Sequence, residues 1–213
     1  MTALDLTTRW PVEHVSAAVL RAGTVVATIG DPDRVQRLAS ISKPMTAWAT
    51  LVAVEEGIVE LDQPVGQPGC TVRHLLAHAG GYPFDGPDPI ARPEATRMYS
   101  NTGIELVADA VERESAMAFA DYLHEALFVP LDMHATALRG SPAHGVYSNL
   151  TDTSRFVAEV MRPSLIHATS AADAERIHYP ALAGIVPGVG RYEQCPWGLG
   201  FEVRGTKTPH WTG

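Results

Sequence analysis

Ser40 and Lys43 are the residues whose types and spacing most directly suggest chemistry. They stand three positions apart, close to one helical turn, at the start of an apolar segment with helical spacing that ends at Gly57. A helix there places hydroxyl and amine on one face, and burial lowers the pKa of the amine so that it can take the serine proton. The Ser40 backbone N–H, at the positive end of the helix dipole, can bond a developing oxyanion. The pattern predicts an acylatable serine.

A simpler interpretation of the same four residues is a capping serine followed by a solvated lysine. The sequence contains ten serines and only two lysines, Lys43 and Lys207. With so few lysines, chance places only about 0.1 such pairs in the chain, so the short motif is moderately informative. Both interpretations stay open on spacing alone.

The elements that must position these residues follow from periodicity. Residues 15–30 read as two strands that meet at a turn, Ala22-Gly23. Helices are expected at 71–79, 103–114, 119–128 and 151–161, and a strand at 197–204. The proline-rich stretch 82–93 is expected to be a surface loop of the kind that lines a site.

This order of elements predicts an α+β fold, an α/β sandwich. An antiparallel sheet is built from both chain ends and flanked by helices, with a helical region in the middle. We expect one domain over 1–213, in which 1–60 and about 190–213 form the sheet part and about 61–189 the helical part.

Composition limits the partners. The chain has 213 residues, 46% of them hydrophobic and 19% charged, and its net charge is −8. An acidic balance argues against nucleic acid and anionic membranes. No apolar run is long enough to span a bilayer, and the N-terminus lacks a signal peptide pattern, so a cytoplasmic location is expected. Cys70 and Cys195 are predicted to be buried free thiols.

Several segments, in order, carry a resemblance to a known family. They are LASISK at 38–43, TVRHLLAHAGGYP at 71–83, YSNTGIELVADAVE at 99–112, PLDM at 130–133 and WGLGF at 197–201. The chain resembles the serine β-lactamase and penicillin-binding-protein superfamily, in particular its class C-like, esterase and D-alanyl-D-alanine carboxypeptidase branch. The resemblance implies the β-lactamase/transpeptidase-like fold.

The resemblance also implies roles for individual residues. Ser40 is similar to the nucleophile and Lys43 to its partner base. Tyr99 and Asn101 match the second motif, Tyr-x-Asn. Tyr99 is expected to act as a phenolate, or as a phenol in a relay with Lys43, and the neighbouring cation is expected to lower its pKa. Asn101 is expected to hold the Lys43 ammonium or a substrate amide.

A second triplet, Tyr147-Ser148-Asn149, spells the same motif. It can instead be a loop that leads into a helix, with Asn149 or Thr151 as the cap and Tyr147 packed. Tyr99 is preferred because the segment that follows it matches the family.

The third motif departs from the family pattern. Lys207-Thr208 is followed by Pro209, which fits an inner strand poorly. Either Trp211, Thr212 and Gly213, which fit better, are the motif and the candidate substrate-binding residues, or the true motif lies beyond Gly213, which is the alternative that we favour. In both cases the family's closing strands and C-terminal helix are missing, so the chain is expected to be incomplete at its C-terminal side.

Histidines invite a metal interpretation, because His74 and His78 lie four positions apart on one expected helix. No acid follows His74, and the resemblance makes this helix a scaffold. We expect no metal and no cofactor.

The function that these observations favour is a serine hydrolase that acts through an acyl-enzyme on ester or amide (β-lactam-like) carbonyls, with an ester slightly preferred over a β-lactam or a D-amino-acid peptide. The expected partner is that small-molecule substrate, and the sequence does not predict an oligomeric state. The alternatives are a non-catalytic binding or sensor homologue and a truncated inactive fragment.

Overall fold

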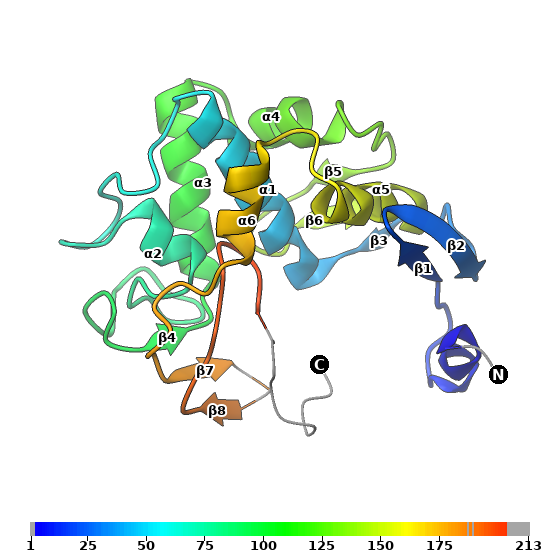
Figure 1. The fold of residues 1–213 in the computed structure, drawn as a ribbon, viewed down its shortest axis with the longest axis horizontal. Coiled ribbons are helices and arrows are strands. Elements are labelled where there is room, and N and C mark those ends of the chain that lie inside the picture. The colour runs from blue at the N-terminus through cyan, green and yellow to red at the C-terminus, as the bar shows by residue number, and fades with distance from the viewer. Residues whose placement is uncertain (1–2, 187, 189, 204–213) are drawn as a thin grey trace.

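The structure is a computed structural model that describes residues 3–186, 188 and 190–203 (Figure 1). It has helices and three small sheets, so the α+β class is confirmed. In chain order the elements are η1 (Ala3–Arg9), β1 (Ala17–Arg21), β2 (Thr24–Ile29), β3 (Gln36–Arg37), η2 (Ala39–Ile41), α1 (Ser42–Glu55), α2 (Val72–Leu76), β4 (Arg97–Met98), α3 (Asn101–Ser115), α4 (Phe119–Leu123), η3 (His124–Phe128), β5 (Ala137–Leu138), β6 (Val146–Ser148), α5 (Leu150–Met161), α6 (Ala168–Glu175), β7 (Gly184–Val186) and β8 (Gly190–Tyr192).

Helix α1 forms the centre of the core. Its side chains are apolar nearly all round, which is typical of a helix that is buried on every side. Met45, Trp48 and Leu51 are buried, and the helix contacts α3, α4 and η3. The helix ends at the predicted glycine, because Gly57 has φ +72° and its N–H donates to Val54 O at 3.1 Å.

The N-terminal hairpin is confirmed. Ala22 and Gly23 both have positive φ, +49° and +77°, which is the requirement of the tight turn that suits the right-handed twist of two strands. The hairpin packs beside α5 and lies on the opposite side of the molecule from β7 and β8 (Figure 1).

The expected sheet of both chain ends is not formed by the described residues. There β1 pairs only with β2, while the other sheets have the orders β3-β6-β5 and β4-β7-β8. Residues 204–213, which were expected to belong to the sheet part, lie outside the described residues. Among the described residues, the strands form three small sheets rather than one large sheet.

Helix starts follow the capping residues of the sequence. Thr71 caps α2 in a reciprocal arrangement with His74, and Ser100 and Asn149 cap α3 and α5 through their side chains. The helix expected at 119–128 is α4 continued by the π-helical turn η3.

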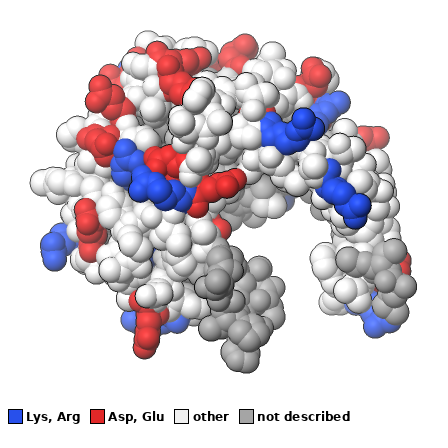
Figure 2. Space-filling view, viewed as in Figure 1, with Lys and Arg blue, Asp and Glu red and all other residues white. Residues whose placement is uncertain are grey.

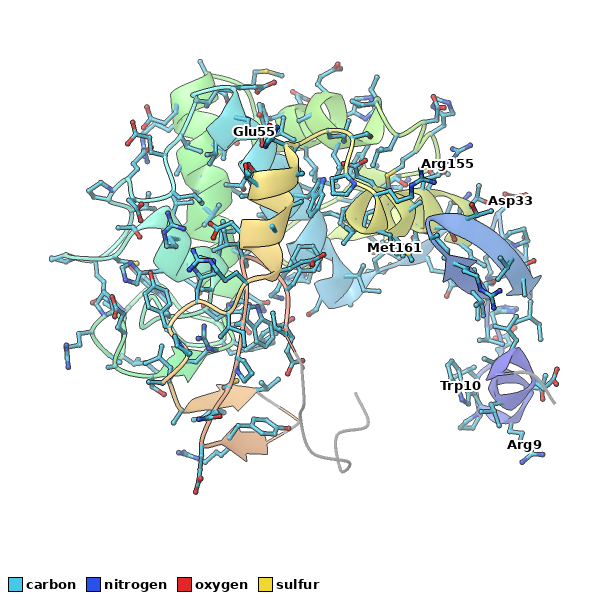
Figure 3. The ribbon with its side chains drawn as sticks, viewed as in Figure 1. Arg9, Trp10, Asp33, Glu55, Arg155 and Met161 are labelled. Atoms are coloured by element: carbon cyan, nitrogen blue, oxygen red, sulfur yellow. The ribbon has the colours of Figure 1, made fainter. Side chains whose placement is uncertain are left out.

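The C-terminal end of α1 is tied to the start of α6. Glu55, the last residue of α1, accepts a hydrogen bond from the His167 N–H at 2.7 Å (Figure 3).

The strand expected at 197–204 is wrong for the described part of that segment. Trp197 makes single bridges with His178 and Glu202, and the chain then turns at Gly200, where φ is +83°. The Gly200 N–H donates to Leu76 O at 2.9 Å, and a Cβ at Gly200 would collide with Ala47 on α1. Alternating apolar residues suggested a strand, but the two glycines between them allow a turn against α1.

Other sequence expectations concern the surface and the thiols. Acidic and basic side chains are interspersed on the face drawn in Figure 2. Within the described ranges, the chain has no helix with the length and apolar character needed to cross a membrane. Cys70 is a free thiol, and both it and Cys195 are buried.

Candidate active site

Ser40 lies in the 3-10 turn η2, immediately before α1. The spacing predicted a helix that begins at Ser40, but α1 begins at Ser42. Ser42 is buried, donates to Ala39 O at 2.7 Å and accepts from the Val146 N–H at 3.0 Å. These bonds fix the turn that presents Ser40, whose side chain is exposed at the surface of the described residues.

The Lys43 amine lies next to the Ser40 hydroxyl. Its Nζ is 3.2 Å from Ser40 Oγ, 2.5 Å from Asn101 Oδ1 and 3.0 Å from Ala143 O, although the residue is only 1% exposed. An ammonium has three protons, and three acceptors surround this one. The solvated-lysine interpretation is therefore wrong, and Lys43 is held against Ser40 by partners from two other parts of the chain.

Burial lowers the pKa of Lys43 to about 8, while the carboxylates of Asp85 and Glu105 oppose the shift. The expected direction is confirmed, because desolvation disfavours the charged amine. Below this pKa the amine donates to Ser40, and above it the neutral amine can accept the serine proton.

We predict that acylation of Ser40 accelerates as pH rises from 6 to 9, with a midpoint near the Lys43 pKa of about 8. The rate rises with pH because only the neutral amine can accept the proton. A fluorophosphonate bonds to Ser40 through phosphorus and loses fluoride, and this step needs the same removal of the serine proton. Its rate at each pH, read by intact mass from stopped reactions, measures the profile. A rate that is flat across this range would contradict a lysine base.

Tyr99 lies over the lysine, with its ring centroid 4.6 Å from Nζ. The expected lowering of its pKa is wrong. Burial raises the pKa of Tyr99, Glu202 raises it further, and hydrogen bonding with the Ser40 side chain only partly opposes the rise. Its ring packs against Phe84 and Trp197, at centroid distances of 6.1 and 5.6 Å, and these apolar surroundings disfavour the charged phenolate. Tyr99 is therefore a neutral phenol at neutral pH.

Asn101 connects the lysine to a loop. It is buried at the first position of α3, its backbone N–H donates to Phe84 O at 2.8 Å, and its Oδ1 accepts from Lys43. Its Nδ2 donates to Asp85 Oδ1 at 2.9 Å. The structure thus brings together all four central residues that sequence analysis selected.

The second Tyr-Ser-Asn triplet has the simpler role considered for it. Asn149 Oδ1 accepts from the Asp152 N–H at 2.8 Å and caps α5, and the Tyr147 ring packs under the Arg139 guanidinium at 5.3 Å. The chain just before this triplet nevertheless contributes Ala143 O to Lys43. No side-chain pattern could have signalled that backbone contact.

His78 is a neighbour of the site that sequence analysis set aside. Its imidazole packs against Tyr99 and Trp197 with centroid distances of 4.7 and 5.0 Å, and its Nδ1 accepts from the Ser100 N–H at 3.2 Å. Burial lowers its pKa well below the usual value, assisted by Lys43, so the ring is neutral. His78 supports the Tyr99 loop.

The histidine pair does not share a ligand. His74 Nε2 lies 2.9 Å from Glu94 Oε1, and its Nδ1 is used at the α2 cap. The part of the chain that the structure describes contains no group of three or more metal-ligating side chains. Trp211, Thr212 and Gly213, the proposed third motif, lie outside the described residues, as does Lys207.

Comparison with known proteins identifies the class to which this fold and site belong. The chain is a member of the β-lactamase family, because the family model described as Beta-lactamase matches residues 11–213. A solved beta-lactamase from Mycobacterium bovis is 47% identical and has a TM-score of 0.95, covering 100% of this chain and 79% of that one.

Curated relatives are more distant. Penicillin-binding protein 4* of Bacillus subtilis is 32% identical over 132 residues, which is 46% of this chain and 29% of that protein. A beta-lactamase of Yersinia enterocolitica is 26% identical over 222 residues, 78% of this chain and 55% of the relative. The chain therefore spans only part of the length of the curated relatives that it matches.

Proposed function

We propose that this chain is a serine hydrolase that forms an acyl-enzyme at Ser40. The observation that carries the proposal is the 3.2 Å contact between Lys43 Nζ and Ser40 Oγ, held by Asn101 and Ala143. An amine with a lowered pKa beside a serine hydroxyl is the arrangement that activates a weak nucleophile. Membership of the β-lactamase family supports the same reaction class.

In the proposed reaction the neutral Lys43 amine takes the Oγ proton while Oγ bonds to the substrate carbonyl carbon. The backbone N–H of Ser40, at the start of the η2–α1 segment, bonds the developing oxyanion. When the tetrahedral intermediate collapses, the Tyr99 phenol gives its proton to the leaving group and recovers one from the Lys43 ammonium. Water then attacks the acyl carbon by the reverse proton path, which releases the acid and restores Ser40.

An ester is the substrate class that we propose, ahead of a β-lactam or a D-amino-acid peptide. An activated ester can lose its leaving group without a proton, so the nucleophile and base suffice. An amide nitrogen also needs a proton from Tyr99, and the raised pKa of that phenol makes it a weaker proton donor. A cytoplasmic location stays a prediction.

Replacement of Ser40 by alanine tests the proposal. A fluorophosphonate should add once to the wild-type chain, and Ser40→Ala should show no adduct and no turnover of a p-nitrophenyl ester, which the wild type should hydrolyse faster than a penicillin. Intact mass and peptide mapping locate the adduct. Ser115→Ala is the matched control, because Ser115 ends α3, a 15-residue helix whose first residue is Asn101, about 20 Å away.

Two results would contradict the hydrolase. One is a folded wild-type chain that takes up no label at Ser40, and the other is turnover that survives in Ser40→Ala. If Ser40→Ala keeps the affinity of the wild type for a penicillin while neither protein reacts, the non-catalytic binding alternative is correct.

A further inference from the structure

The loop over residues 82–93 is bonded to the Tyr99-Ser100-Asn101 motif at several points. The Asn101 N–H donates to Phe84 O at 2.8 Å, and Ser100 Oγ donates to Pro83 O at 2.6 Å. Thr102 Oγ1 donates to Gly86 O at 3.0 Å. The loop is therefore anchored on the start of α3. Asp85 lies between two of the anchored residues, Phe84 and Gly86, and is held close to the site.

Asp85 determines which way the Asn101 amide points. Its carboxylate only accepts hydrogen bonds, and Asn101 Nδ2 donates to it at 2.9 Å. The amide oxygen must then face the opposite way, toward the Lys43 ammonium, where the Nζ to Oδ1 distance is 2.5 Å. A flipped amide would set oxygen against carboxylate and NH₂ against ammonium, so both contacts favour one orientation.

We propose that Asp85 is a positioning residue of this active site, which fixes the Asn101 amide and, through it, the place and the charge of the Lys43 amine. The inference rests on the proposed function and extends it. Asp85 acts on Ser40 indirectly, through hydrogen bonds between Asp85 and Asn101, between Asn101 and Lys43 and between Lys43 and Ser40, and not by contact with substrate.

Among the described residues, the groups whose charge or titration bears on Lys43 lie on several elements of the fold. Asp85 and Glu105 both favour the charged amine, while Tyr99 is a neutral phenol and His78 a neutral imidazole. Glu105 accepts from Ser141 Oγ, and the segment beside it contributes only the Ala143 carbonyl to the lysine. Removal of the Asp85 charge leaves Glu105 as the remaining carboxylate that acts on Lys43, so the amine should lose its proton more easily.

Three variants separate charge from hydrogen bonding. Asp85→Asn removes the charge and keeps an acceptor for Asn101, whereas Asp85→Ala removes both. Asp88→Asn is the matched control, because Asp88 is exposed in the same loop, as Asp85 also is, and the charge change is identical. The chain has only two lysines, so labelling with carbon-13 lysine gives two titrating signals, and Lys207→Arg assigns the one from Lys43.

The NMR titration and the acylation rate are measured on each variant from pH 6 to 10. In Asp85→Asn and Asp85→Ala the Lys43 midpoint and the acylation profile should move to lower pH by roughly half a unit to one unit. Asp85→Ala should also lower the plateau rate about 10-fold, because the amide is free to turn. Asp88→Asn should overlay the wild type.

Coincident titrations of Lys43 in Asp85→Asn, Asp88→Asn and the wild type would overturn the positioning role. So would a lower plateau in Asp85→Ala without any change in midpoint, since a purely structural contribution gives that result. A wild type without an adduct at Ser40 would instead refute the proposed function, and the NMR titration would still decide whether Asp85 controls the lysine.

Discussion

Lys43→Met should reduce the rate of Ser40 acylation by about 10²–10⁴-fold, because the base is removed from a folded site. Methionine has a similar length and is apolar, so it fits the buried position without a charge. The loss leaves Asn101 Oδ1 and Ala143 O without their donor, at a cost of about 1–3 kcal/mol each. Acylation rates with a p-nitrophenyl ester and urea unfolding measure the two effects separately.

Lys207→Met is the control for that experiment, since it removes the other lysine of the chain. It should acylate like the wild type, and its rate should keep the rise through pH 8. The residual rate of Lys43→Met should not show that rise. If Lys43→Met acylates as fast as Lys207→Met, the amine is not the base, and the proposed proton path is incorrect.

Trp48→Ala should lower the free energy of unfolding by about 3–5 kcal/mol, the range for removal of a large aromatic from a packed core. Trp48 is 0% exposed on α1, and its Nε1 donates to Glu159 Oε1 at 3.2 Å. Its ring meets those of Phe156 and Phe201 edge-on, with centroids 6.4 and 5.9 Å away. Urea unfolding followed by circular dichroism measures the change.

Trp10→Ala is the matched control, because Trp10 is 55% exposed and lies near η1, away from α1 (Figure 3). It should change the unfolding free energy by no more than about 0.5 kcal/mol. Trp48→Phe keeps most of the apolar area and should fall between the two. Equal effects of Trp48→Ala and Trp10→Ala would show that α1 is not the centre of the core.

Local patterns predicted most of the helices, although α1 begins two residues later than expected and α6 was not predicted. The starts of α3 and α5 and the end of α1 depend on periodicity and on the local caps Ser100, Asn149 and Gly57, each of which lies within two residues of its helix. The segment after Trp197 was predicted wrongly, since its turn depends on a close approach to Ala47, far away in the sequence. The expected sheet of both chain ends is not found among the described residues for the same reason, because the partners of short strands lie far apart in the sequence.

The site was partly predictable. Ser40 and Lys43 follow from spacing, and Tyr99 and Asn101 came from the resemblance rather than from spacing. Asp85 and Ala143 carry no sequence signal, because the fold alone brings them to the amine. The Tyr99 pKa was predicted in the wrong direction, since a neighbouring cation can be read from a motif but the apolar rings around the phenol cannot.

The Lys43 amine has partners 58 and 100 residues away along the chain, at Asn101 and Ala143. Two long chain closures must therefore be complete before the serine becomes reactive, and such closures come late when contacts are distant in sequence. The time course with which Ser40 takes up a covalent label during refolding therefore reports when these last contacts form. In a chain in which only α1 has formed, Ser40 should not react with the label.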